Sequence, residues 1–493
     1  MTAIQQKNWQ GGLDALSRAA LVADQTAFLW EHLGLCAVNL EKYEAAFLHT
    51  TRLLWCEPNH VLGHLNRGRI AVKLQQIDDA IADFEWVMAS DQAKPETKAE
   101  AGIELIALYR DRANNRAEMK AAFDAIARVE QLPKESIKEP GRFFRHRIFT
   151  YLKAGDYKKG FAYYEQRSDK NIKLFSQPIW MALPHHRDDN CWDGVSSLKD
   201  KSILVAGEQG LGDVMQFARF LPLFLKLLEK QKARVNNKAV KLEVYPELAE
   251  LLQGSPICKD ITVVARGADV GPFDLWVKLG SLPHYLDVTI DNIPFADKKS
   301  LPYITPALPP RPQLMAAPTR RKVGLCWSSN MKANDNQLRS VPSLRDLLPL
   351  WDAELCDFYS LQMGPQSKEI ETIGMEAALL DLSPYINTMA DTARFIHELD
   401  LLITIDTSVF HLAGAMGKPV WVLAPYASDW RLGLGKPLLA DSDGKDDAKH
   451  GVKQGTPFVS PWYPTSRIFR AAKPGEWYEL IEALRDELVA NKW

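Results

Sequence analysis

The sequence predicts an all-helical N-terminal region followed by two α/β halves, each built on a mostly parallel sheet. Two observations support this. Residues 1–170 lack strand patterns and repeat with a period of 34 residues. From Ser202 onward, short apolar runs alternate with amphipathic segments, which is typical of parallel strands connected by helices. A chain of 493 residues is also too long for one hydrophobic core, so several domains are expected.

Composition and charge exclude several classes of protein. The hydrophobic content of 46% and the charged content of 25% are ordinary for a soluble globular protein. The formal net charge is −2, and no long run of Lys and Arg indicates a nucleic acid or an anionic membrane as partner. No apolar run reaches the roughly 18 residues that span a bilayer, and the polar start predicts no signal peptide. Six scattered cysteines without a C-x-x-C pair indicate thiols in a reducing cytoplasm.

The N-terminal period is carried by small residues. Gly34, Gly68 and Gly102 lie 34 residues apart, as do Ala46 and Ala80. Small residues at fixed places let two antiparallel helices approach closely. The positions that fit a repeat are Trp30, Leu33, Gly34, Ala46 and Pro58 in the first unit, His64, Gly68, Ala80 and Phe84 in the second, Gly102 in the third, and Phe144, Tyr157, Gly160 and Tyr164 in the last.

This pattern resembles the tetratricopeptide family, so residues 1–170 are expected to form an α-solenoid, with a half-repeat at 12–27 and a loss of register after Asn115. The resemblance implies a concave groove that binds a peptide or a protein segment. A packing or dimerisation module is the alternative.

Residues 171–200 show no clean periodicity and are predicted to be a connector. The connector contains the pair His185-His186. No further metal ligands stand at a suitable spacing, so a surface loop is favoured over a metal site.

The two α/β halves are expected at 201–305 and 322–475, with a proline-rich linker at 306–321 and a final helix at 476–493. In the first half we expect strands at Ile203–Ala206, Leu242–Tyr245, Ile261–Ala265 and Leu275–Lys278, and helices at 213–229 and Glu247–Leu252. In the second half we expect strands at Val323–Trp327, Phe358–Leu361, Leu401–Ile405 and Val420–Leu423, and helices near 343–350, 366–375, 389–398 and 407–416. Ligands of such folds bind outside the carboxyl ends of the strands.

A glycine-rich turn, GEQGLGD, follows the first strand and precedes a helix. Its spacing differs from the G-x-G-x-x-G of dinucleotide-binding folds, and no Lys-Ser/Thr follows as in a P-loop. The backbone at Gly210, Leu211 and Gly212 is expected to approach a ligand at the helix N-terminus. Asp213 is either a cap of this helix or a functional carboxylate.

Polar and aromatic residues follow three strands of the second half. Asp406, Thr407 and Ser408 combine hydroxyls with a helix N-terminus that suits a diphosphate, and Arg339 has the planar fork that suits phosphate. Taken singly, each residue is also compatible with a cap, a solvated loop or a core histidine. The candidates are Trp327, Ser328, Asn330, Asn334 and Arg339 after the first strand, Gln362 after the second, and Asp406, Thr407, Ser408 and His411 after the third.

Four motifs together resemble the bacterial glycosyltransferases of the heptosyltransferase type (glycosyltransferase family 9), and the whole chain resembles proteins that fuse tetratricopeptide repeats to such a domain. The motifs are GEQGLGDVMQFARFLP, VGLCWSSN with NDNQLRSVPSL, DTARFIHELDLLITIDTSVFHLAGAMGKPVWVLAPYASDWR, and SPWYPTSRIFR. The resemblance implies the GT-B fold of two Rossmann-like domains, with the acceptor on the first half and a nucleotide sugar on the second.

By the same resemblance, Asp213 is expected to be the general base, Arg339 to hold the donor diphosphate where simpler members carry Lys, and Asp406, Thr407 and His411 to contact the donor. Trp327, Asn330, Gln362 and Ser408 complete the expected donor site. Asp429, Trp430, Arg431, Trp462 and Tyr463 lie within the motifs but receive no role.

The expected function is therefore a cytoplasmic glycosyltransferase that uses a nucleotide sugar as substrate and needs neither cofactor nor metal. An Asp-x-Asp in Asp441–Asp447 would suit a metal, but its Gly- and Lys-rich surroundings favour a loop. The repeat groove indicates a polypeptide acceptor. The alternatives are transfer to a glycolipid or lipopolysaccharide precursor, and a repeat scaffold whose nucleotide-binding transferase domain is inactive.

Overall fold

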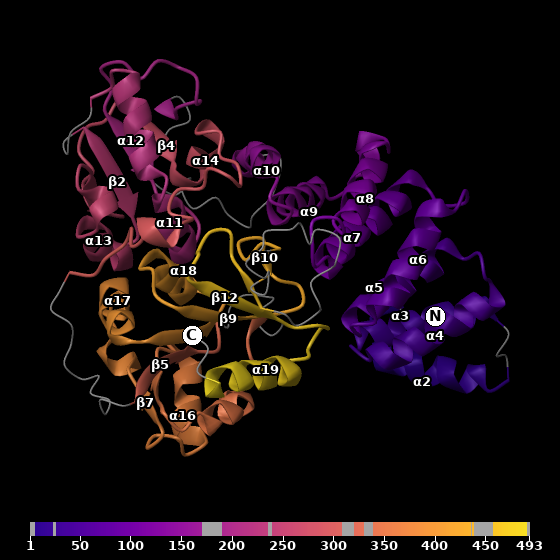
Figure 1. Ribbon diagram of the computed structural model, residues 1–493. Coiled ribbons are helices and arrows are strands. Elements are labelled where there is room, and N and C mark those ends of the chain that lie inside the picture. Colours follow the sequence, from indigo (N-terminus) through magenta and orange to yellow (C-terminus); the bar gives the residue numbers. More distant parts are fainter. Residues whose placement is uncertain are drawn as a thin grey trace. The chain divides into compact units, whose positions relative to one another are not determined.

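The computed structural model describes residues 5–22, 26–169, 190–234, 239–307, 320–329, 339–434, 436–437 and 457–490 (Figure 1). The chain divides into two compact units, Met1–Thr150 and Tyr151–Trp493. The helices after Thr150 therefore group with the α/β part, although the sequence pattern extends the repeats to 170. Among the described residues, no helix is both long and apolar enough to cross a membrane.

The first unit is an array of helix pairs, which confirms the predicted helical repeats. Residues Lys7, Glu41 and Gln75 have φ of 57°, 56° and 61°, and they lie 34 residues apart in the tight turns between helices. A left-handed residue at this place ends a helix and reverses the chain. The helices are α2 (Trp9–Ala20), α3 (Ala27–Asn39), α4 (Tyr43–Cys56), α5 (Val61–Lys73), α6 (Ile77–Ala89), α7 (Pro95–Arg112), α8 (Lys120–Glu130) and α9 (Pro140–Lys153).

The periodic glycines are places of close helix contact. A Cβ on Gly34 would lie 3.2 Å from Thr50 Cγ2, and a Cβ on Gly68 would lie 2.7 Å from the Phe84 ring. Real Cβ atoms almost never come as close as the second value, so the α5–α6 pair requires glycine. The repeat becomes irregular between α7 and α8, at the predicted loss of register after Asn115.

The first α/β half carries a four-stranded parallel sheet in the order β3-β2-β1-β4. Its strands are β1 (Ile203–Ala206), β2 (Val240–Val244), β3 (Thr262–Ala265) and β4 (Leu275–Lys278), and its longer helices are α11 (Leu211–Ala218), α12 (Leu221–Lys230) and α13 (Pro246–Gln253). The single helix expected at 213–229 is wrong. Because Pro222 has no N–H to donate, it starts a second helix after a break at the buried Arg219.

The second α/β half carries an eight-stranded sheet in the order β10-β11-β12-β9-β8-β5-β6-β7. The six strands from β12 to β7 are parallel, and numbered along the chain they have the order 3-2-1-4-5-6 of doubly wound dinucleotide-binding folds. The strands are β5 (Arg321–Cys326), β6 (Cys356–Ser360), β7 (Leu379–Asp381), β8 (Leu401–Ile405), β9 (Val420–Ala424), β10 (Lys436–Pro437), β11 (Phe458–Val459) and β12 (Ser466–Arg470). The sequence pattern did not predict β7, β10, β11 or β12.

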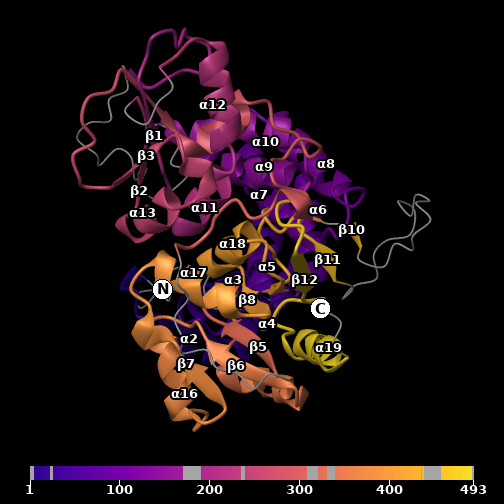
Figure 2. The same cartoon turned by 60° about the vertical axis from the view of Figure 1, so that its left-hand side comes forward.

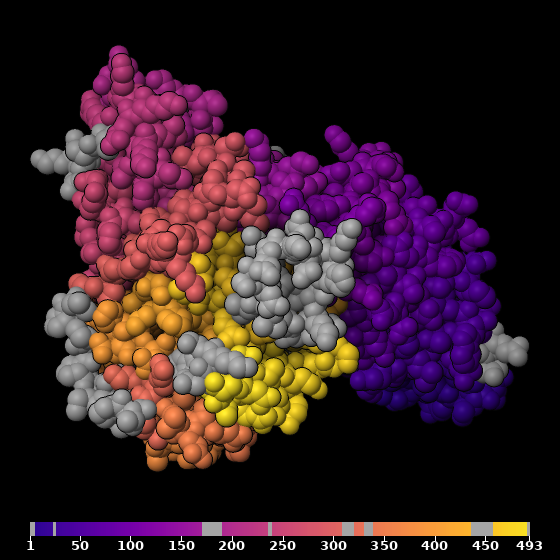
Figure 3. Space-filling view, in the orientation of Figure 1, coloured from indigo at the N-terminus to yellow at the C-terminus, as the bar shows by residue number. Residues whose placement is uncertain are grey.

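Helices cover both faces of this sheet, with α17 (Met389–Glu398) and α19 (Tyr478–Val489) on opposite sides (Figure 2). The segment expected as a helix near 343–350 is a 3-10 helix, η8 (Leu344–Asp352), with Pro349 inside it. Leu480 and Leu484 of α19 share one core with Leu344 of η8. The final helix therefore packs on the second half, where it forms part of the surface (yellow, Figure 3).

Candidate functional site

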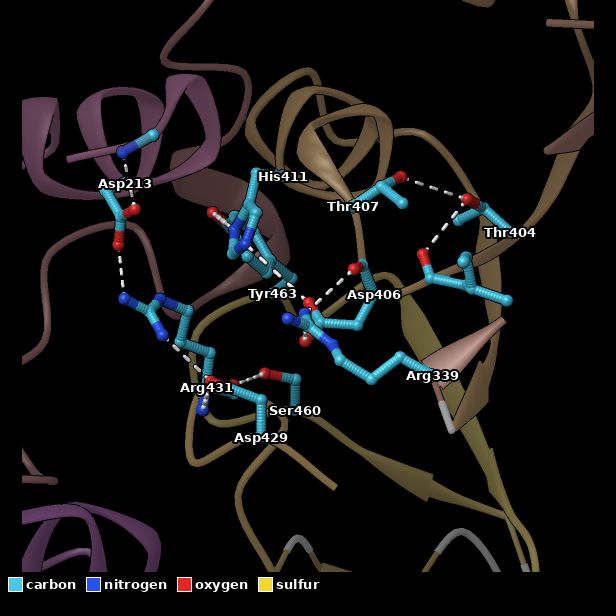
Figure 4. A network of polar contacts seen from close by, with 12 residues as sticks. Asp213, Arg339, Thr404, Asp406, Thr407, His411, Asp429, Arg431, Ser460 and Tyr463 are labelled. Atoms are coloured by element: carbon cyan, nitrogen blue, oxygen red, sulfur yellow. Dashed lines mark hydrogen bonds and ion pairs between the residues drawn. The ribbon is translucent and has the colours of Figure 1, made fainter. Parts of the chain in front are cut away.

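Asp213 stands at the first turn of α11, directly after the glycine-rich turn. Its Oδ2 accepts a hydrogen bond of 3.0 Å from the backbone N–H of Gly210, which makes Asp213 part of the N-terminal cap. Its Oδ1 is ion-paired with Arg431 of the second half (Figure 4). The carboxylate thus caps its own helix and also reaches the other half. Gly210 is exposed, and Leu211 and Gly212 are half-buried beside it.

Arg431 lies between two carboxylates. Its Nη1 lies 2.9 Å from Asp429 Oδ1, while its other terminal nitrogen faces Asp213. The guanidinium lies over the Trp430 ring at 4.4 Å from the centroid. Burial alone would lower the pKa of Arg431, but the charges of Asp213 and Asp429 outweigh burial and raise it well above its usual value. In turn, Arg431 outweighs burial at Asp429, so the pKa of that carboxyl is lowered.

Asp406 follows β8 and is buried. Arg339 donates from Nη2 to Asp406 Oδ2 at 3.1 Å and to its backbone oxygen at 3.3 Å. Burial and the nearby charge of Asp429 raise the pKa of Asp406 to about 6, although Arg339 opposes this. This carboxyl therefore changes its charge just below neutral pH.

His411 lies in α18 (Ser408–Ala415) and links Asp406 to the first half. Its Nδ1 is 2.9 Å from the Tyr463 hydroxyl, and its Nε2 is 3.9 Å from Asp406 Oδ1. Burial first, and the charge of Arg431 second, lower the pKa of His411 to about 3, so the ring is neutral at pH 7. A Cβ on Gly212 would lie 2.6 Å from His411 Cδ2. The glycine-rich turn therefore needs a residue without a side chain where it meets this ring.

Thr407 and Ser408 stand at the N-terminus of α18, as expected. Thr407 is the N-cap residue, but its side chain makes no hydrogen bond to the first-turn amides. Its Oγ1 instead lies 3.5 Å from Thr404 Oγ1. Both residues are half-buried. The helix therefore begins beside Asp406 with no side-chain cap from Thr407, which suits an anion there.

Gln362 and Trp327 lie where β6 and β5 end. Gln362 Oε1 accepts from the backbone N–H groups of Trp327 at 3.0 Å and Ser328 at 2.8 Å, and its Nε2 donates to Ser328 O at 3.1 Å and Met363 O at 2.9 Å. The amide thereby joins the ends of β5 and β6. Trp327 is fully buried in the sheet core. Donor contact by either residue stays a prediction. Asn330, Asn334, the His185-His186 pair and Asp441–Asp447 lie outside the described residues.

Arg219 is an anchor that sequence reasoning missed. It is fully buried, and its Nη1 donates to Trp462 O at 2.8 Å while its Nη2 donates to the Tyr303 hydroxyl at 3.0 Å. Its guanidinium also lies 4.8 Å from the centroid of the Tyr463 ring, which contacts His411. Arg219 and Tyr463 belong to different sequence motifs, and nothing in the sequence indicates that the two side chains meet. The only sequence signal for either residue is that it lies in a motif.

The predicted residues fall into two neighbouring groups of contacts, which include three residues to which the sequence gave no role (Figure 4). One group is Asp213, Arg431 and Asp429, and the other is Arg339, Asp406, His411 and Tyr463. The charges of Asp429 and Arg431 act on Asp406 and so connect the two groups. Across the described residues, no group of three or more His, Cys, Asp or Glu side chains is arranged to hold a metal ion.

Comparison with known proteins gives one related sequence and several structures of similar fold. No family model matches the chain. Protein FlbA of Caulobacter vibrioides is 24% identical over 98% of this chain and 71% of its own length. ADP-heptose lps heptosyltransferase II of E. coli is 13% identical over 59% of this chain and 100% of its own, with a TM-score of 0.35. MamA of Desulfovibrio magneticus is 17% identical over 34% of this chain and 92% of its own, with a TM-score of 0.29. At such similarity, the ligand and the activity have to be argued from this chain's own residues.

Proposed function

We propose that this chain is a glycosyltransferase that moves a sugar from a nucleotide-activated donor to an acceptor hydroxyl. The observation that carries the proposal is where the glycine-rich turn of the first half reaches the second half. Asp213 is ion-paired with Arg431, whose charge acts on Asp406, and the neighbouring Gly212 packs against His411. Asp406 in turn pairs with Arg339. The four motifs that resemble heptosyltransferase-type enzymes contain these same residues and support the same chemistry.

The second half supplies groups that favour the leaving phosphate. As the glycosidic bond of the donor breaks, negative charge grows on the phosphate oxygens. Arg339, whose side chain is 38% exposed and pairs with Asp406, carries the planar guanidinium that suits such a ligand, and α18 begins beside Asp406 with no side-chain cap from Thr407. Fixed donors aimed at a developing charge lower the barrier of such a transfer.

Asp213 is the group that takes the acceptor proton in this proposal. It is the carboxylate that the first half contributes to the network, and the Gly210 amide fixes one of its oxygens. A general base needs a fixed position within hydrogen-bond reach of the hydroxyl it activates. Its second oxygen, held by Arg431, is the one that would meet an acceptor at the junction of the halves.

The acceptor in this proposal is a polypeptide that the repeat unit binds. Large apolar side chains are exposed on consecutive helices of this unit: Phe28 and Leu35 on α3, Leu48 and Trp55 on α4, and Leu62 on α5. Exposed apolar groups that recur on neighbouring helices mark interaction surfaces, and helical repeat arrays commonly bind protein segments.

The donor is tested by thermal unfolding with UDP, ADP, GDP, CDP and CMP. A nucleotide at 100 times its Kd should stabilise the α/β unit by about 2.7 kcal/mol, and the shift should shrink in Arg339→Ala. Arg320→Ala is the matched control, because Arg320 is 40% exposed and pairs with Asp357 at the opposite end of β5. No shift with any nucleotide would argue against a donor site here.

The reaction is tested with labelled donor and cell extract as acceptor source. Asp213→Asn should abolish transfer but keep the nucleotide shift. The control Asp274→Asn, at the far end of β4, should keep both transfer and the nucleotide shift. Full transfer by Asp213→Asn would remove this residue from the mechanism. Label in the lipid fraction would favour a glycolipid acceptor, and nucleotide binding without any transfer would favour a repeat scaffold.

A further inference from the structure

The glycine-rich turn is held by a residue that the sequence pattern assigns to the helical repeats. Arg167 lies in η2 (Glu165–Ser168), which follows α10 (Tyr157–Tyr164), and its side chain is completely buried. Its Nε lies 3.1 Å and 3.3 Å from the two carboxylate oxygens of Glu208, and its Nη2 is ion-paired with the same group. Glu208 is the second residue of the turn, so this ion pair fixes the turn from the side of the helices.

The remaining donors of Arg167 are also satisfied. Nη1 donates to Glu165 Oε1 at 2.7 Å and to the Tyr164 backbone oxygen at 3.1 Å, and Nη2 donates to Ser281 Oγ at 2.9 Å. Ser281 in turn donates to Glu165 Oε2 at 2.8 Å. A buried guanidinium with all of these partners holds a rigid geometry, because each partner fixes a different N–H direction.

The next residue of the turn, Gln209, is held in a strained conformation. Its φ is +64°, a region that residues with a side chain seldom adopt. Its side-chain amide donates to the Tyr164 hydroxyl, and its backbone oxygen accepts from the Tyr245 hydroxyl. Such a conformation persists only where the surroundings impose it. Gln209 leads directly into Gly210, whose amide holds Asp213.

The helix α10 and the end of α9 contact the loop that carries Arg431. Phe161 of α10 meets Trp430 edge to face at 6.1 Å between centroids, and Lys153, the last residue of α9, donates from Nζ to Ser428 O at 3.2 Å. The segment from Lys153 to Arg167 therefore contacts both loops whose side chains form the Asp213–Arg431 pair.

We propose that α10 and η2 are a positioning element of the active site, with Arg167 as a positioning residue that sets the turn presenting Asp213. The catalytic unit then begins near Tyr151 rather than at Ser202, which agrees with the division of the chain into compact units. The part of this inference that concerns catalysis rests on the proposed glycosyl transfer, whereas the part that concerns the turn does not.

Hydrogen exchange tests the positioning directly. Arg167→Gln should speed the exchange of the amides of 207–213 by about 10-fold or more, because the turn opens locally. Tyr164→Phe, which removes one hydroxyl, should do so to a smaller extent and remains informative if Arg167→Gln fails to fold. Arg467→Gln is the matched control, since Arg467 pairs with Glu487 at 3.1 Å elsewhere in the same unit. Unchanged exchange of 207–213 in either folded variant, or an equal rise throughout the α/β unit, would overturn the proposal.

Turnover separates positioning from folding. A small displacement of a reacting group costs about 100-fold in rate, so kcat should fall by about that factor in Arg167→Gln while the donor KM stays within about 3-fold. The double variant with Glu208→Gln, which replaces the ion pair by two amides, should recover part of kcat. A rise of the donor KM with kcat unchanged would contradict the assignment. Faster exchange of the turn in a protein whose wild type transfers no sugar would refute the proposed function but leave the positioning intact.

Discussion

Each of the two units contains a buried carboxylate paired with an arginine, and the two pairs differ in how completely they are coordinated. In the repeat unit, Arg67 donates twice to Asp83, both bonds at 2.8 Å, and His64 Nδ1 lies 2.7 Å from the same carboxylate. In the α/β unit, Asp406 receives one side-chain bond of 3.1 Å from Arg339, and His411 Nε2 stands at 3.9 Å. Both carboxylates are buried, but Asp83 receives more and shorter bonds than Asp406 does.

The number of bonds that a buried carboxylate receives helps to distinguish an ion pair that stabilises the fold from a candidate functional group. A buried carboxylate that receives several short bonds from neighbouring helices joins those helices, as Asp83 joins α5 to α6. A buried carboxylate with few bonds keeps a high desolvation cost, which for Asp406 appears as a pKa raised to about 6. Carboxyls with a raised pKa of this kind gather at functional sites, which fits the proposed role of Asp406 beside Arg339.

Asp83→Ala should give the largest loss of stability. It leaves Arg67 and His64 without their shared partner in the α5–α6 interface, and breaking such a pair costs about 3–5 kcal/mol. Unfolding in urea, monitored by hydrogen exchange of peptides from residues 61–89, measures this loss. The nucleotide shift of the α/β unit should stay at the wild-type value. A loss below about 1 kcal/mol would show that the cluster behaves like an exposed pair, and the contrast with Asp406 would fail.

Asp406→Asn should change stability in a pH-dependent way. The folded-state pKa of about 6 lies above the ordinary aspartate value of 3.8, so folding favours the protonated carboxyl. That stability is present below pH 4 and is lost as the pH rises through 6. The stability of Asp406→Asn minus that of wild type should therefore rise by about 2.4 kcal/mol between pH 4 and pH 7.

Unfolding in urea at pH 4, 5, 6 and 7, monitored by hydrogen exchange of peptides that contain β8, measures this difference. The Asp274→Asn control should give a flat difference over the same window, because hydrogen bonds from Ser202 lower the pKa of Asp274. A flat line for Asp406→Asn as well would mean that Asp406 is no less satisfied than Asp83.

Much of the fold could be predicted because the signals are local. The first-half strands Ile203–Ala206 and Leu275–Lys278 agree residue for residue with β1 and β4, since buried parallel strands are short apolar runs bounded by turn residues. Strands β7 and β12 were missed because they are short and include charged residues, such as Asp381 in β7 and Arg467 and Arg470 in β12. They belong to the sheet only through their pairing with neighbouring strands. The break at Arg219 was missed because its cause is a set of tertiary contacts.

Part of the candidate site could be located from the sequence for the same reason. Asp213, Arg339, Asp406 and His411 could be named because each follows a strand, and strand ends of a parallel sheet meet at one edge. The role of Arg431 could not be named, because its partner Asp213 lies 218 residues away in the chain. Arg167 and Glu208 were hidden by the repeat pattern, which assigns Arg167 to the helical region although its side chain belongs to the glycine-rich turn.

Replacing one glycine in each unit by alanine should give the smallest losses of stability. Because the two glycines are similarly crowded, these variants allow the closest comparison of the two units. A Cβ on Gly68 would lie 2.7 Å from the Phe84 ring, and a Cβ on Gly212 would lie 2.6 Å from His411 Cδ2, so both alanines crowd a ring by nearly the same amount. Overpacking costs about 1–3 kcal/mol, and the better helix propensity of alanine returns up to about 1 kcal/mol. A net loss of roughly 1–2 kcal/mol is expected for each variant.

The consequences of the two alanines should differ. Gly68→Ala should lower only the stability of the repeat unit, seen as faster exchange in α5 and α6, with transfer to a small acceptor unchanged. Gly212→Ala should move His411 away from the Tyr463 hydroxyl that it contacts at 2.9 Å and lower both the nucleotide shift and kcat. Wild-type turnover by Gly212→Ala would mean that the close approach of the two halves only packs the molecule. Loss of turnover without loss of stability would show that the position of the ring, rather than its burial, serves the reaction.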